Sequence, residues 1–307
     1  MRLSRFTVLI FATAAAMLVA SEAATEAGFV RRSRIQKRQK SQRQAVLALH
    51  QTAANGLPTV ALLGNSLLLE AIDAPVLDAK VRNRIAIQTY YVDQTGFYDW
   101  YYGLRALFAE GLHPRYVLLG LTGPQLAATG VLADYSSRYL FQASDLLEIA
   151  RTTHMDATSA SEMILAHYSA YYALRSNIHG VLRARLAPGL AGFLFGIRDV
   201  VLGAELGDAD LRVVAGERLQ ALSELCKAHG VQLLFLVPAA PTSGAAAIQL
   251  GGQDHRIVVF APIKDGVFDA SYYHDGYHLN AKGSAIFTDA LAADLLKAFP
   301  NAGAGGN

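Results

Sequence analysis

Two short segments, far apart in the chain, carry residues suited to nucleophilic catalysis. The first reads VALLGNSLLLEA, in which Ser66 follows Gly64 and Asn65 and precedes an apolar helical run. The second reads SYYHDGYHLNAKG and holds Asp275 and His278 three positions apart. A serine hydroxyl needs a base, and the base needs a group that fixes its tautomer. We therefore expect Ser66 as nucleophile, His278 as base and Asp275 as the group that orients it.

Each segment also has a plainer interpretation. Ser66 stands where a helix N-cap is common, and the loop around Asp275 is equally typical of a solvated polar turn. His274, Asp275 and His278 together offer potential metal ligands, but the sequence provides no further ligand cluster to complete such a site. We predict neither a metal nor another cofactor.

The elements around these segments predict an α/β domain. Short, continuous apolar runs are typical of buried parallel strands, and they occur at residues 59–63, 84–88, 116–120, 231–237 and 256–260. Helical spacing marks residues 97–110, 209–229 and 281–297, with Gly230 placed as a C-cap glycine. The expected fold is a three-layer α/β/α sandwich around a parallel sheet of about five strands. Ser66 then lies at the carboxyl edge of the sheet, where such folds bind ligands.

About 110 residues separate the third and fourth predicted strands, far more than one crossover helix needs. Residues 142–204 are helical and aromatic in character and indicate an inserted helical subdomain. Its glycine-rich stretch, 187–196, suits either packing or a lid. The main domain is expected to span residues 44–300, and the tail 301–307 is expected to be disordered.

The N-terminal segment, residues 1–43, combines an apolar run with a strong positive charge. The run FTVLIFATAAAMLVA at residues 6–20 is a secretory signal or a short membrane anchor. Ser21-Glu22-Ala23 offers a small-x-small cleavage site, and cleavage stays an open question. The segment holds nine Lys or Arg against two acids, so of the overall charge of +2 about −5 remains for residues 44–307. A mildly acidic domain makes nucleic acid an unlikely partner. The single cysteine, Cys226, excludes an intrachain disulfide and is expected in the core.

The order and placement of the two segments resemble the SGNH or GDSL hydrolase family. In that family the nucleophile lies in a Gly-Asp-Ser turn after the first strand, and Asp-x-x-His precedes the last helix. The matching residues here are Gly64-Asn65-Ser66-Leu67 and Asp275-Gly276-Tyr277-His278, continued by Leu279, Asn280 and Gly283. The resemblance covers roughly residues 58–297 and implies Ser-His-Asp acyl-enzyme chemistry.

The resemblance also implies an oxyanion hole, and here the sequence departs from the family pattern. The Ser66 N–H and a glycine N–H usually contribute, and Gly96 is our candidate for the glycine. The third block usually supplies an asparagine, but this chain reads GLTGPQL, so Thr122 or Gln125 is expected to donate instead. Losing one such donor typically costs about 10²–10³ in rate.

The combination of an N-terminal hydrophobic segment with a degenerate first block resembles membrane-attached SGNH-like proteins of bacterial envelope polysaccharide acylation. The resemblance implies an esterase or O-acyltransferase, exported to the periplasm or the outer face of the inner membrane. Its partners would be an acylated polysaccharide or small acyl ester, the membrane, and envelope polysaccharide machinery. A non-catalytic SGNH-like scaffold in such a complex is the main alternative, and a soluble lipolytic enzyme with an apolar lid is a third.

Overall fold

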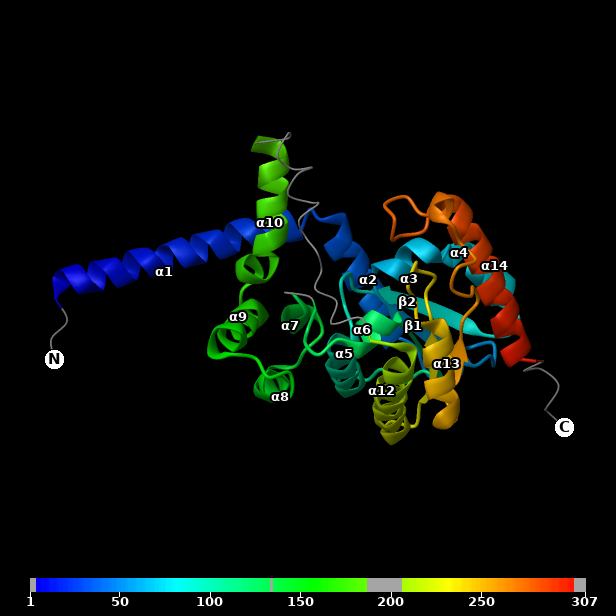
Figure 1. Ribbon diagram of the computed structural model, residues 1–307. Helices are drawn as coiled ribbons and strands as arrows, with labels where there is room; N and C mark the ends of the chain where they lie inside the picture. The colour runs from blue at the N-terminus through cyan, green and yellow to red at the C-terminus, as the bar shows by residue number, and fades with distance from the viewer. Residues whose placement is uncertain (1–3, 133–134, 187–205, 301–307) are drawn as a thin grey trace. The chain divides into compact units, whose positions relative to one another are not determined.

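The computed structural model describes residues 4–132, 135–186 and 206–300, apart from the side chains of residues 177 and 181–186 (Figure 1). The chain divides into two compact units. The helical unit comprises residues 1–40 and 134–200, and the sheet unit comprises residues 41–133 and 201–307. The N-terminal segment and the predicted insertion therefore fall into one unit. The glycine-rich stretch 187–196, for which packing and a lid were both open, and the predicted tail 301–307 lie outside the described residues.

The sheet unit alternates strands and helices, as the sequence predicts. Its elements are β1 (Thr59–Gly64), α3 (Ser66–Ala71), α4 (Ala74–Val81), β2 (Ala86–Tyr91), α5 (Phe97–Ala109), β3 (Tyr116–Gly120), α6 (Gly123–Ala127), α12 (Asp208–Ala228), β4 (Gln232–Leu236), α13 (Ala245–Asp254), β5 (Val258–Phe260), the 3-10 turn η3 (Ala270–Tyr272) and α14 (Ala281–Ala298). α2 (Arg34–Leu47) leads from the helical unit into it.

The five strands form one all-parallel sheet in the order β2-β1-β3-β4-β5, which confirms the predicted fold class. The chain leaves β1 towards β2 on one side and returns to β3 on the other. β1 and β3 are therefore neighbours at the point where the strand order reverses, and their carboxyl ends open the crevice in which such folds bind ligands. Ser66 follows β1 at this edge.

Two glycines let α3 pack closely on that edge. A Cβ on Gly64 would lie 2.6 Å from Leu68 Cδ1 and 3.0 Å from the carbonyl oxygen of Gly120, and a Cβ on Gly120 would also collide with Leu68. Leu68 therefore fills the space that the missing Cβ atoms leave. The absence of a Cβ at Gly64 thus makes room for a side chain.

The second strand lies two residues later than predicted. The N–H groups of Arg84 and Ile85 donate to the carbonyl of Val81, at 2.8 and 3.1 Å, and so complete the last turn of α4. The strand therefore begins at Ala86, and the following tyrosines belong to it. An apolar run does not distinguish the last turn of a helix from the start of a strand, because Ile85 is fully buried in the turn as it would be in a strand.

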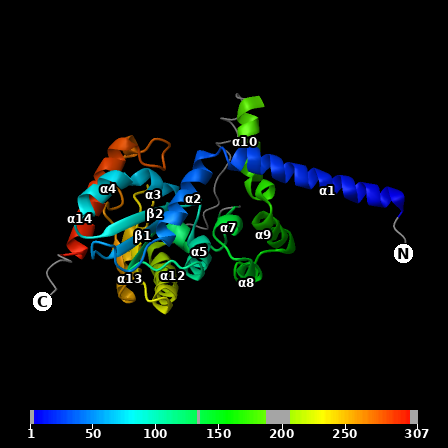
Figure 2. The same ribbon diagram turned by 180° about the vertical axis from the view of Figure 1, so that it is seen from behind.

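Helices cover both faces of the sheet (Figures 1 and 2). On one face, Val60 and Leu62 share a core with Leu68 of α3 and with Phe287 and Leu291 of α14. On the other, α12 packs on β4 and α13 on β5. The predicted helices at 97–110, 209–229 and 281–297 correspond to α5, α12 and α14.

The C-terminal end of α12 has the glycine cap and the buried cysteine that the sequence predicts. Gly230 adopts a left-handed backbone with φ of +70°, as a C-cap glycine should. Cys226 in the last turn is fully buried, and burial raises the pKa of its thiol to about 12. The cysteine is therefore an inert core residue, as predicted.

The helical unit contains an N-terminal helix and the described part of the predicted insertion. Its elements are α1 (Arg5–Thr25), the π-helical η1 (Glu26–Val30), α7 (Ser136–Tyr139), the 3-10 turn η2 (Ala143–Asp145), α8 (Leu146–Thr152), α9 (Ala157–Tyr168) and α10 (Ala170–Leu186). By length and composition, Arg5–Val30 could be either a signal sequence or a membrane anchor.

Candidate active site

Ser66 is the first residue of α3, immediately beyond the carboxyl end of β1. Asn65 precedes it as N-cap in an extended conformation, and its Oδ1 accepts the N–H of Leu67 at 3.1 Å. The Ser66 side chain is half-buried. Within the described ranges its own N–H meets no acceptor, as is usual in the first turn of a helix. That amide is thus available to stabilise negative charge beside the hydroxyl.

The loop before α14 presents Asp275 and His278 by folding back on itself. The His274 N–H donates to the carbonyl of His278 at 3.0 Å, and Gly276 adopts a φ of +80° that side-chain-bearing residues rarely take. Asp275 Oδ1 then accepts the N–H groups of Tyr277, at 3.0 Å, and of His278, at 2.7 Å. The Asp-Gly-x-His spacing therefore holds the carboxylate beside the imidazole.

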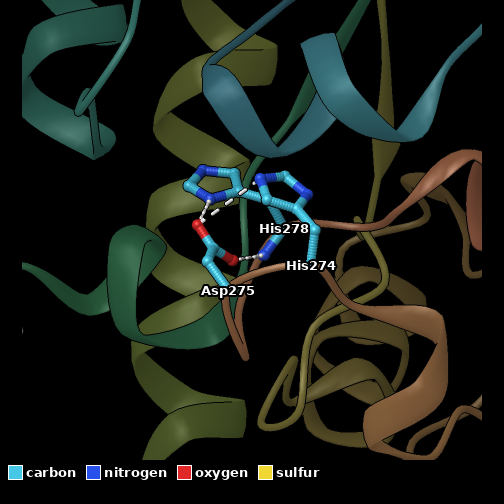
Figure 3. Close-up of side chains that lie close together, drawn as sticks. All are labelled: His274, Asp275 and His278. Carbon is cyan, nitrogen blue, oxygen red and sulfur yellow. Dashed lines mark hydrogen bonds and ion pairs between the residues drawn. The ribbon is translucent and has the colours of Figure 1, made fainter.

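The three predicted residues meet in one hydrogen-bonded chain. His278 Nε2 lies 3.0 Å from Ser66 Oγ, and His278 Nδ1 lies 2.7 Å from Asp275 Oδ2. Figure 3 shows the second of these contacts, with His274 beside it. The fold thus brings together residues 209 positions apart in the sequence, with the geometry that a nucleophile, a base and an orienting carboxylate require.

Asp275 stays ionised over the ordinary pH range. Partial burial opposes its charge, but the hydrogen bonds from the His278 backbone, the His278 ring and the Tyr277 backbone outweigh burial and hold the pKa of Asp275 well below its usual value. A permanent carboxylate at Nδ1 favours the tautomer in which Nε2 is free to accept the serine proton.

A buried network ties the Ser66 turn to the loop after β2. Asn65 Nδ2 donates to the carbonyl of Thr95 at 2.9 Å. Thr95 Oγ1 donates to the carbonyl of Val92 at 2.7 Å and accepts the indole N–H of Trp100 at 2.8 Å. Asn65, Thr95 and Trp100 are all fully buried. The family resemblance indicates only that Asn65 stands in place of aspartate; the role seen here depends on the amide being both donor and acceptor.

Gly96 does not occupy the role expected of it. Its N–H donates to Asp99 Oδ2 at 3.0 Å, and the same carboxylate oxygen accepts the N–H of Leu132 at 3.1 Å. A Cβ on Gly96 would lie 2.8 Å from the carbonyl oxygen of Gln125. The structure therefore uses Gly96 as a tightly packed helix cap, and its amide is already engaged.

The Thr122 N–H and the Gln125 side chain also have other partners. Gln125 Oε1 accepts the N–H of Thr122 at 3.1 Å, and Gln125 Nε2 donates to the Tyr277 hydroxyl at 3.5 Å. Burial raises the pKa of Tyr277, and the nearby Thr122 hydroxyl partly offsets that effect. Thr-x-x-Gln is a capping-box pattern, which could have predicted the first contact. Gln125 thus contacts the loop that carries Asp275 and His278 through Tyr277, and the Thr122 hydroxyl is buried with no hydrogen-bond partner among the described residues.

His274 lies beside Asp275 and His278, and the three residues offer potential metal ligands. One ligand atom each from His274, Asp275 and His278 lies within 4.8 Å of the others. His274 Nε2 is 3.7 Å from Asp275 Oδ2, a longer contact than the one that His278 makes with the same oxygen. The shorter contact and the serine beyond it favour the triad as the use of this loop.

A cavity and a group of aromatic side chains also lie in the sheet unit, but neither includes Ser66 or His278. A cavity of about 540 Å³ is lined by residues of α6, α12 and the loop after β4, but neither Ser66 nor His278 lines it. The aromatic side chains of Tyr90, Trp100 and Tyr102 belong to the core, since each is at most 1% exposed.

No model of a known protein family matches the chain, and a search of curated proteins gives no significant match.

Proposed function

We propose that the chain is an SGNH-type serine esterase or O-acyltransferase that acts on acyl esters of an envelope or secreted polysaccharide. The observation that carries the proposal is the continuous contact from Asp275 through His278 to Ser66, with heavy-atom separations of 2.7 and 3.0 Å. The sequence resemblance suggested these three residues independently of their geometry.

In the proposed reaction Ser66 Oγ attacks the acyl carbonyl carbon while His278 Nε2 takes the serine proton. Asp275 stabilises the resulting imidazolium and holds the ring in place. Collapse of the tetrahedral intermediate breaks the ester bond, and His278 returns the proton to the leaving alkoxide. The acyl group then passes from Ser66 to water in an esterase, or to a sugar hydroxyl in a transferase.

The proposed oxyanion hole rests on the Ser66 N–H. This amide is unpaired within the described ranges and lies at a helix N-terminus, which favours developing negative charge. The Gly96 amide is already engaged by Asp99, whereas the Thr122 hydroxyl is unpaired among the described residues and stays the candidate second donor. One donor fewer corresponds to a slower enzyme, by about 10²–10³.

The engaged Gly96 amide favours one alternative, a non-catalytic scaffold in a polysaccharide modification or export complex. Its N–H reaches Asp99 at 3.0 Å inside a fully buried cap. A protein that only binds acylated polymer needs no oxyanion hole, although it would have no need of the Ser66–His278 contact either.

Turnover of an activated acetyl ester by the purified chain tests the proposal. We expect Ser66→Ala and His278→Ala to lower kcat/KM by about 10³-fold or more, and a fluorophosphonate to label Ser66. The matched control is His274→Ala, which removes a neighbouring imidazole of the same loop. It should retain activity, as should the wild-type protein in the presence of a chelator.

The outcomes separate the candidates. Activity lost in both His274→Ala and the chelated protein would point to a metal site and refute the triad. Absence of both turnover and serine labelling would favour the scaffold. Comparing acetyl with long-chain esters distinguishes a polysaccharide esterase from a lipolytic enzyme, and adding a soluble oligosaccharide acceptor distinguishes transfer from hydrolysis.

The proposed place of action is the outer side of a bacterial inner membrane or the periplasm. The N-terminal helix is compatible with export, and the mildly acidic remainder of the chain does not suit nucleic acid. An acylated envelope polymer is the substrate class that this location offers.

A further inference from the structure

The N-terminal helix α1 is apolar on all sides. Ser4 caps it, accepting the Thr7 N–H at 3.1 Å, and from there the helix runs without a break to Thr25. Its large side chains are 51–72% exposed: Phe6, Val8, Leu9, Ile10, Phe11, Met17, Leu18 and Val19. A single exposed apolar residue needs no explanation, but a whole helix of them must be covered.

A lipid bilayer fits this surface better than a protein groove would. A protein partner usually covers one stripe of a helix, whereas α1 has no polar face along residues 6–20. Residues 6–21 span about 24 Å at 1.5 Å per residue, somewhat less than the ~30 Å of a hydrocarbon core. Arg5 at one end can extend its side chain to the interface and so accommodate the difference.

The other end of α1 is built into the helical unit through Glu22. Its Oε1 accepts the N–H of Ala170 at 2.6 Å, and its Oε2 accepts the N–H of Tyr171 at 3.1 Å and the hydroxyl of Ser169 at 2.8 Å. Ser169 Oγ in turn accepts the N–H of Tyr172 at 3.1 Å. A carboxylate from α1 therefore caps the first turn of α10, where the helix dipole favours negative charge.

A second contact, one turn further along the chain, joins the end of the N-terminal helix to α7. Arg138 of α7 donates to Glu26 Oε1 at 2.7 Å, and Thr25 beside it is only 5% exposed. Residues 22–26 thus form polar contacts with two other helices of the helical unit, α7 and α10. Residues 6–20 form no side-chain hydrogen bond with another helix in the part of the chain that the structure describes.

We infer that α1 is retained in the mature protein as a membrane anchor, and that its last turn is also a structural part of the helical unit. Cleavage at the small-x-small site would fall after Ala23 and would remove Glu22 with the leader. The N–H groups of Ala170 and Tyr171 would then lose their acceptor. The anchor and the insertion are therefore one folding unit, whether or not the ester chemistry proposed above is correct.

The first experiment follows the N-terminus of the full chain, produced in a bacterial host with a C-terminal tag. We expect the intact mass of the purified protein to include residues 5–23, and the protein to stay in the membrane fraction after a carbonate wash. A mature N-terminus at Ala24 or later would overturn the inference. An uncleaved protein that the wash releases would overturn the assignment of lipid as the covering partner.

The second experiment measures amide hydrogen exchange in α10 of the same protein in detergent. Glu22→Ala should speed exchange at Ala170 and Tyr171 by about tenfold, since one hydrogen bond to a charged group contributes at least that factor. The matched control is Asp156→Ala, because Asp156 caps the neighbouring α9 from its own loop, accepting the Ser159 N–H at 2.7 Å. It should loosen α9 and leave α10 unchanged. Equal exchange in Glu22→Ala and the wild type would refute the capping role.

Discussion

Asn65→Asp tests whether the buried amide beside Ser66 acts as a hydrogen-bond donor. The exchange keeps the side chain's shape and its Oδ1 acceptor for Leu67, but it replaces the Nδ2 donor by an oxygen. At 2.9 Å that oxygen would face the carbonyl of Thr95 in a site with no exposure to water. Two acceptors then oppose each other unless the new carboxyl binds a proton.

The loss of folding stability in Asn65→Asp can be worked out from the cost of keeping that carboxyl protonated. Keeping an aspartate with an unfolded pKa of about 3.9 protonated at pH 7 costs roughly 1.4 kcal/mol per pH unit, or about 4 kcal/mol. Leaving it charged costs the lost hydrogen bond and an unsatisfied carbonyl, together about 2–4 kcal/mol before any charge is buried. We therefore expect Asn65→Asp to lower the free energy of unfolding by about 3–4 kcal/mol at pH 7.

The sign of the pH dependence makes the test specific. The folded-state pKa of the new carboxyl is raised, so its contribution to stability is fully present below the unfolded pKa and is lost as the pH rises towards the folded pKa. The penalty relative to wild type should therefore nearly vanish near pH 4. It should then grow with pH by at most about 1.4 kcal/mol per unit.

Urea unfolding, followed by the fluorescence of the chain's single tryptophan, provides the assay. Trp100 is fully buried and donates to Thr95 in the same network. The control is Asn55→Asp, an exposed asparagine whose Oδ1 accepts the Leu57 N–H at 3.3 Å, and it should change stability little. A penalty for Asn65→Asp that is absent at pH 7, or independent of pH, would refute the reasoning.

Three further exchanges test other parts of the site. Asp275→Asn should lower kcat on an acetyl ester by on the order of 10²–10⁴, because His278 would lose the partner that fixes its tautomer; unchanged kcat in a folded variant would contradict the triad. Gly96→Ala should destabilise the fold by roughly 1–3 kcal/mol in urea unfolding, because the new Cβ would lie 2.8 Å from the Gln125 carbonyl oxygen; a neutral result would show that the loop can yield. Tyr277→Phe removes the 3.5 Å contact from Gln125 and should reduce kcat/KM about two- to tenfold, with little change in stability; a loss as large as that of Asp275→Asn would instead assign the hydroxyl a direct catalytic role.

Much of the sheet unit could be predicted because its signals are local. Buried parallel strands are continuous apolar runs, and all five predicted runs overlap the observed strands, although those at 84–88 and 256–260 start two residues early. The start of the strand at 84–88 could not be read from apolar character, because Ile85 is buried whether it ends a helix or begins a strand. The distinction lies in its N–H, which donates to Val81, and an apolar pattern carries no information about backbone partners.

The candidate nucleophile, base and orienting carboxylate could likewise be proposed from residue types, their order and a resemblance. Asp275 and His278 are close in sequence, and a glycine between them permits the turn. The partners of Gly96, Thr122 and Gln125 were not foreseen, although Gly-x-x-Asp and Thr-x-x-Gln are both capping patterns. The resemblance suggested these residues as oxyanion donors; the Gly96 amide is engaged by Asp99, whereas the Thr122 hydroxyl has no partner among the described residues.

By itself the sequence determined which residues are available for chemistry and which segments form the sheet, because apolar periodicity and turn chemistry act over a few residues. Only the tertiary structure decided how polar groups are paired. It placed Ser66 against His278, turned Asn65 towards Thr95, and joined Glu22 to the first turn of α10 across 148 positions. Each of these contacts depends on the direction of a single N–H or lone pair, which is fixed when distant segments pack.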